Sequence, residues 1–165
     1  MNSTRTDPPP RPSLLLLSGL LLLTLGIGAV GSIATIREIP TWYASLQKPS
    51  FNPPNQIFGP VWTTLYVLMS FSLWLIWNST PSGPLSLRSH FLLVLALNAA
   101  WSPVFFGLHA MRSAATIIIA YAILLTALLV RLIRNRPLAG WIQLPHLIWI
   151  LFATWLNLSL CKLNP

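Results

Sequence analysis

Residues 14–36 read LLLLSGLLLLTLGIGAVGSIATI, a run without a charged side chain. As a helix, an apolar run of about 20 residues crosses a hydrocarbon core about 30 Å thick. Inside lipid every backbone polar group needs a partner within the protein, which favours helices. Four further apolar segments follow, so the sequence predicts an all-α integral membrane bundle of five transmembrane helices. The expected helices span residues 14–36, 57–77, 89–107, 113–132 and 141–163.

The composition agrees with a membrane protein. The chain has 165 residues, of which 55% are hydrophobic and 7% are charged, and its mean hydropathy is +0.69. A soluble domain has about 25% charged residues. The net charge of +8 comes from basic residues that stand singly between apolar runs, where they set topology against anionic lipid. We therefore expect the lipid bilayer as a partner and no nucleic acid. The single Cys161 offers neither a disulfide nor metal-ligand spacing, and we expect no metal site.

The N-terminal end divides into two parts. Residues 1–13 are polar and Pro-rich, which predicts a disordered leader, and residues 14–165 form the membrane domain. The first apolar run could also be a cleaved signal peptide, since Ala29, Val30 and Gly31 resemble a cleavage site. The run continues to residue 36, however, so we expect the first helix to be retained.

Small residues lie at four-residue spacing on the first helix, at Thr24, Gly28 and Ser32. Such a face permits close helix contact and allows, without requiring, the homodimer that we expect. The leader lacks the features of an organelle transit peptide. This favours a bacterial-type cell membrane, with an organelle membrane left open.

Basic residues in the short connectors favour a cytoplasmic N-terminus. Five spans divide them into one group of Arg5, Arg11, Arg88, Arg131, Arg134 and Arg136, and another of Arg37, Lys48, Arg112 and Lys162.

The first connector, residues 37–56, is the long one. From Trp42 to Trp62 the sequence reads WYASLQKPSFNPPNQIFGPVW, which is polar, Pro-rich and aromatic. Such a segment neither spans a bilayer nor forms a soluble core. It predicts a lid-like loop over something held between the helices.

Aromatic and amide side chains recur at helical spacing inside three of the predicted spans. Such stripes either pack against neighbouring helices or line a ligand pocket, and both interpretations stay open. An amide in hydrocarbon needs another helix or a ligand as its partner, which favours a pocket. Prolines in these spans either are tolerated or bend helices apart. The stripes are Trp62, Tyr66 and Met69; Asn98, Trp101 and Phe105; and Pro145, Trp149 and Ala153 with Leu156 or Asn157, and the prolines are Pro60, Pro103 and Pro145.

Few residues could carry chemistry. No acidic residue lies inside a predicted span, which excludes a carboxylate proton relay there. His90 and His109 lie at span ends and are expected at the interface. His146 could face the pocket, a neighbouring helix or the iron of a bound porphyrin. The sequence has no nucleophile with a base at readable spacing and no Gly-rich phosphate loop.

Four motifs in order carry a resemblance: WYASLQKPSFNPP, FGPVWTTLYVLMS, ALNAAWSPVFFG and LPHLIWILFATWLN. Together they resemble the translocator protein family, also called tryptophan-rich sensory proteins (TspO/MBR), from about Thr41 to Asn157. The resemblance implies a five-helix bundle, often dimeric, that binds porphyrins such as protoporphyrin IX and drug-like ligands such as benzodiazepines. The resemblance implies that no cofactor is required, because the porphyrin is the ligand.

The resemblance also implies roles for particular residues. The first connector would close a pocket, and the chain would act as a receptor or sensor. The alternatives are a light- and oxygen-dependent porphyrin-degrading enzyme, with Trp62 and Trp149 as its catalytic residues, or a tetrapyrrole or sterol transporter. The implied ligand-binding residues are Tyr43, Trp62, Tyr66, Asn98, Trp101, Phe105, Trp149 and Ala153, and the implied lid residues are Trp42, Lys48, Pro49, Phe51, Pro53 and Pro54.

The chain departs from the family at two places. Phe51 stands where many members have Trp, so the indole N–H is lost there, and we expect a different ligand preference. The cholesterol motif of animal members needs a Tyr before a basic residue. This chain has Lys162 without that Tyr, which makes cholesterol recognition by that route doubtful.

Overall fold

A computed structural model describes residues 13–77 and 86–165. The predicted leader lies outside the described residues except for Ser13. This residue begins the first helix as its N-cap, and its hydroxyl accepts a hydrogen bond from the Leu16 amide at 3.1 Å. Most of the second connector also lies outside them.

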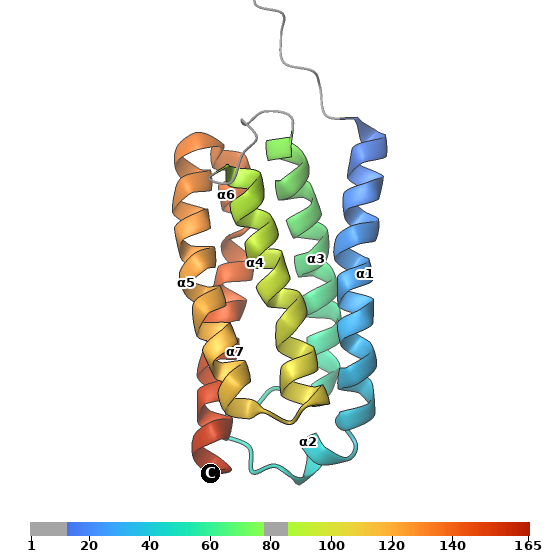
Figure 1. The fold of residues 1–165 in the computed structure, drawn as a ribbon, viewed down its shortest axis with the longest axis vertical. Coiled ribbons are helices and arrows are strands. Elements are labelled where there is room, and N and C mark those ends of the chain that lie inside the picture. The colour runs from blue at the N-terminus through green and yellow to red at the C-terminus, as the bar shows by residue number, and fades with distance from the viewer. Residues whose placement is uncertain (1–12, 78–85) are drawn as a thin grey trace, which may run out of the picture.

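All regular structure in the described residues is helical, which confirms the all-α prediction. Five helical spans there are long and apolar enough to cross a membrane, and they stand side by side in Figure 1. The chain is therefore an integral multi-pass membrane protein. Which membrane holds it, and on which side the N-terminus lies, stay predictions. The elements are α1 (Leu14–Glu38), α2 (Trp42–Ser45), α3 (Asn55–Trp77), α4 (Leu87–Ser102), the π-helical η1 (Pro103–Gly107), α5 (Met111–Asn135), α6 (Pro137–Ile142) and α7 (Leu144–Leu163).

The first span, α1, is the least buried and presents leucines outward, as a lipid-facing helix does. Its small residues are used inside the chain. The Thr24 hydroxyl shares a hydrogen bond of 2.6 Å with Ser70 of α3. A Cβ on Gly28 would lie 2.3 Å from a ring carbon of Tyr66, so only glycine lets this ring approach α1 so closely. Two of the three predicted small residues, Thr24 and Gly28, therefore join α1 to α3, whereas the Ser32 hydroxyl bonds to the Ala29 carbonyl within α1. The homodimer stays a prediction.

Two prolines shape the other spans. Pro103 begins η1, a π-helical turn in which the Leu108 amide bonds to the Pro103 carbonyl at 3.0 Å. Wide turns of this kind re-aim side chains and occur at functional sites. The last span is two helices, because Gln143 separates α6 from α7 and Pro145 lies in the first turn of α7.

Candidate ligand-binding site

The first connector, residues 39–54 between α1 and α3, includes the single turn of α2. Figure 1 shows it passing below the bundle at the end where the C-terminus lies. On one side the Trp42 ring stacks on His109 at 4.2 Å between centroids. On the other side the Gln47 backbone exchanges two hydrogen bonds of 3.0 Å with the Asn164 side chain. The connector is thus an ordered strap fixed at both edges, and its role as a lid stays a prediction.

His109 itself has a strained backbone. Its φ of 51° lies in the left-handed region, which costs a non-glycine residue free energy. Its imidazole lies 2.9 Å from a Glu38 carboxylate oxygen. The ring stack holds α2, and the Glu38 contact holds the end of α1, against the turn between η1 and α5.

Tyr43 lies on α2 within the strap and is buried. Its hydroxyl donates to the Asn52 side-chain oxygen at 2.8 Å. Burial raises the pKa of the Tyr43 phenol above 10.0, with the Asn52 hydrogen bond acting in the opposite direction. The Lys48 ammonium lies 4.9 Å above the same ring and donates to two connector carbonyls.

The remaining predicted lid residues lie toward α7. Phe51 stacks on Trp155 at 3.8 Å and meets Phe152 edge-on, so the position that lacks the family's indole faces α7. The prolines shape the turn: the Pro49 carbonyl accepts from the Asn52 amide at 2.9 Å, the Pro53 carbonyl accepts from the Asn52 side chain at 3.0 Å, and the Pro54 carbonyl accepts from the Ile57 amide at 3.0 Å.

The predicted pocket residues form three contact groups. In the first, beside the strap, Phe105 is 1% exposed and packs against Tyr43 and Trp42. Trp101 stacks on Phe105 at 4.9 Å. Its indole donates to the Asn157 side-chain oxygen at 3.0 Å. The side-chain amide of Asn157 on α7, which we expected to need a partner, thus has one in the Trp101 indole on α4.

The second group joins α3 to α4. Trp62 and Tyr66 lie 5.7 Å apart on α3, at the predicted i, i+4 spacing. The Tyr66 hydroxyl donates to the Asn98 side-chain oxygen at 2.9 Å. The second group thus places the hydrogen-bonded pair of Tyr66 and Asn98 beside the indole ring of Trp62.

The third group lies on α7. Trp149 packs between Phe58 of α3 and Phe152, with centroids at 5.9 and 5.5 Å. Its indole nitrogen is buried and has no hydrogen-bond partner among residues 13–77 and 86–165. Ala153 is half-buried and packs against the main core.

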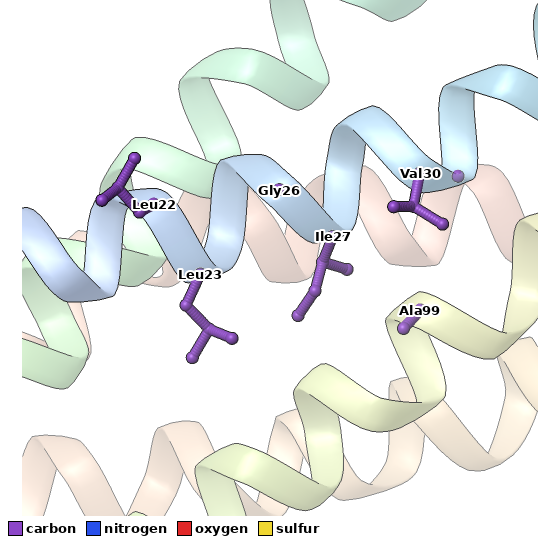
Figure 2. A pocket seen from close by; sticks show the side chains of 7 residues that line it. Leu22, Leu23, Gly26, Ile27, Val30 and Ala99 are labelled. Carbon is purple, nitrogen blue, oxygen red and sulfur yellow. The ribbon is translucent and has the colours of Figure 1, made fainter.

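A groove lies apart from these groups, between α1 and α4. Its volume is about 400 Å³, and Figure 2 shows Leu23 and Ile27 of α1 and Ala99 of α4 around the space between the helices. It contains none of the predicted pocket residues. Since ligand sites orient their ligands with a few polar groups, this apolar groove suits hydrocarbon rather than an oriented polar ligand. Its lining is Leu22, Leu23, Gly26, Ile27, Val30, Gly31 and Ala99.

His146 is fully buried and does not face a ligand's iron. One ring nitrogen hydrogen-bonds to the Tyr121 hydroxyl, and the other lies 2.8 Å from the Gln143 side-chain oxygen. The interpretation of His146 as a porphyrin iron ligand is therefore wrong, because neither ring nitrogen is available.

Sequence reasoning missed several residues of these groups. Phe58, Phe152 and Trp155 complete the rings, and Tyr121 and Gln143 are the partners of His146. Gln143 carried a usable signal, since an amide near Pro145 in an apolar segment must find a partner.

These features define a polytopic α-helical membrane protein with aromatic side chains gathered beneath a structured strap at one end. The TspO/MBR family model matches residues 20–163, and the chain belongs to this family. It is 38% identical over 152 residues to the tryptophan-rich protein TspO of Archaeoglobus fulgidus, covering 92% of this chain and 99% of the archaeal protein.

Two further relatives show how widely the family is spread. The human translocator protein is 37% identical over 141 residues, which cover 82% of each chain. The tryptophan-rich sensory protein of Cereibacter sphaeroides is 32% identical over 137 residues, covering 83% of this chain and 85% of the relative.

Proposed function

We propose that this chain is a membrane receptor or sensor that binds a flat, largely apolar ligand of the porphyrin type, or a drug-like ligand of similar chemistry, among the three aromatic groups. The observation that carries the proposal is the Trp149 indole N–H, buried between Phe58 and Phe152 without a partner in the part of the chain that the structure describes. An unsatisfied buried donor costs roughly 1–3 kcal/mol. A ligand that brings an acceptor to this nitrogen recovers that free energy.

The rest of the site suits the same ligand class. A macrocycle stacks on indole and phenol faces, and a few polar groups orient it. The strap would admit the ligand by releasing its contacts with His109 and Asn164. The Cereibacter sphaeroides relative is named a sensory protein, which supports the receptor interpretation.

The test is a titration of the purified protein in detergent with protoporphyrin IX, followed by tryptophan fluorescence. We expect saturable quenching. Trp149→Phe keeps a ring but removes the donor, and we expect it to weaken binding about fivefold, the value of one net hydrogen bond. Trp141→Phe is the matched control, because Trp141 is exposed on α6.

Two outcomes would count against the proposal: non-saturable quenching, or equal affinity in wild type and Trp149→Phe. The same sample under light tests the enzyme hypothesis for Trp62 and Trp149. A bilin-like absorption spectrum would favour it, whereas bleaching at the rate of free porphyrin would oppose it. Transport predicts ligand movement across sealed vesicles.

A further inference from the structure

A chain of buried side chains connects the second aromatic group to the junction of α6 and α7. The Tyr66 hydroxyl donates to Asn98, and Asn98 is also a hydrogen-bonding neighbour of the Tyr121 hydroxyl. Tyr121 bonds to His146, and His146 to Gln143. The chain ends where the Gln143 amide nitrogen donates to the Leu68 carbonyl at 3.3 Å.

The Leu68 carbonyl fixes the direction of the bonds around His146, because a carbonyl can only accept. Gln143 must turn its NH₂ toward Leu68, so its oxygen faces His146 and accepts from it. The proton of a neutral imidazole then lies on Nδ1. The other nitrogen, Nε2, is left as an acceptor, so Tyr121 donates its hydroxyl hydrogen to it.

The same reasoning continues to the proposed site. Since the Tyr121 hydrogen is used on His146, its oxygen can only accept from Asn98. This would turn the Asn98 NH₂ toward Tyr121 and its oxygen toward Tyr66, and the structure has the Asn98 oxygen on the Tyr66 hydroxyl at 2.9 Å. The Tyr66 hydrogen is therefore used on Asn98, and the Tyr66 oxygen offers lone pairs alone.

We infer that Gln143 and His146 are positioning residues that make the Tyr66 hydroxyl a hydrogen-bond acceptor toward the ligand, so that the site selects ligands with a donor at that point. This inference rests on the proposed function, since it takes Tyr66 to face the ligand. The Trp149 indole N–H is a donor that a ligand acceptor would satisfy. The favoured ligand therefore carries a donor and an acceptor at different positions.

The inference predicts that the polarity of Tyr66 can be reversed from a distance. In Gln143→Leu nothing holds the His146 proton on Nδ1. His146 can then donate from Nε2 to Tyr121, Tyr121 can donate to Asn98, and the Asn98 amide turns round. Asn98 then donates to Tyr66, and the Tyr66 hydrogen becomes available to a ligand.

The probes are 2-naphthol, which carries a donor, and 2-methoxynaphthalene, which has an acceptor alone. In wild type we expect 2-naphthol to bind about fivefold more tightly, the ratio that one net hydrogen bond gives. Tyr66→Phe should remove this preference, and Gln143→Leu should remove or reverse it. Ser72→Ala should keep it, because Ser72 makes a buried bond to the Ala139 carbonyl of α6 outside the chain of bonds.

A second measurement needs no variant in the chain of bonds. In the double variant His90→Gln/His109→Gln, His146 is the one remaining histidine. Its ¹⁵N spectrum at neutral pH should show a pyrrole-type Nδ1 and a pyridine-type Nε2. A pyridine-type Nδ1 would overturn the inference, even if Gln143→Leu failed to fold.

The two proposals fail in different ways. If neither naphthalene nor protoporphyrin IX quenches tryptophan fluorescence saturably, the proposed function fails. If they bind but wild type does not distinguish the two naphthalenes, or Gln143→Leu keeps the wild-type preference, the inference fails and the proposed function stands.

Discussion

The strap end and the buried chain from Tyr66 to Gln143 are both enclosed, but they are held by different forces. At the strap end, rings of Trp42, Tyr43 and Phe105 pack together, and the closing polar contacts are with exposed groups. In the buried chain the contacts are directed hydrogen bonds. Tyr66–Asn98 and Tyr121–His146 join different helices, and His146–Gln143 is local to the start of α7.

The difference shows which changes each region can accept. Ring packing depends on volume and tolerates a side chain of similar shape. A buried hydrogen-bond chain depends on direction, so that removing one atom leaves partners unsatisfied. The strap, held by rings and exposed contacts, should therefore tolerate more changes than the buried chain, which must keep the direction of each bond.

The largest expected effect tests the role of volume at the strap end. Phe105→Ala should destabilise the protein by roughly 3–5 kcal/mol, because Phe105 is 1% exposed and its loss leaves a cavity among rings. Phe105→Leu is the control and should cost less than about 1.5 kcal/mol. Thermal unfolding in detergent measures both. A Phe105→Leu variant as unstable as Phe105→Ala would show that ring geometry, rather than volume, holds this end.

The same substitution in the two regions gives the sharpest comparison. Tyr121→Phe should cost about 1–3 kcal/mol, because it leaves a buried nitrogen of His146 without its partner. Tyr43→Phe should cost about 0.5–1 kcal/mol, because Asn52 is half-buried at the bundle end and can turn to another partner. Both are measured by thermal unfolding. Equal losses would remove the distinction between the two regions.

Alkaline pH should loosen the strap. Burial raises the pKa of Tyr43 above 10.0 in the folded state, so the folded state holds the phenol proton more tightly than the unfolded state does. This contribution to stability is fully present below about pH 10 and is lost as pH rises through the folded pKa. Limited proteolysis of the strap at about pH 9 and about pH 11 should show faster cleavage at the higher pH. The increase should be smaller in Tyr43→Phe, and an equal increase would contradict the assignment to Tyr43.

The smallest effect concerns the exposed contact at the edge of the strap. Glu38→Gln should cost at most about 1 kcal/mol, because the contact with His109 is open to solvent. The Trp42 ring stack remains in this variant. Proteolysis at the strap should rise slightly, and added salt should reduce the difference from wild type. A loss as large as that of Tyr121→Phe would mean that the strap, too, depends on one directed contact.

Part of the site followed from sequence spacing. Trp62 with Tyr66, and Trp101 with Phe105, meet because residues four apart share a helical face. The sequence could not show that the predicted pocket residues would separate into three contact groups. That depends on how each helix is rotated and on the wide turn at Pro103. The α1–α4 groove was missed for the same reason, since it arises between two helices rather than on one.

The sequence by itself determined the all-α membrane bundle and its five spans, because the need to satisfy backbone groups in lipid acts on each segment separately. Tertiary structure alone decided which polar atoms meet. Sequence spacing allowed His146 to face a pocket, a neighbouring helix or a porphyrin iron. In the packed bundle its two ring nitrogens hydrogen-bond to Tyr121 and Gln143. Hydrogen bonds between helices depend on rotation and register, and neither is encoded in a single segment.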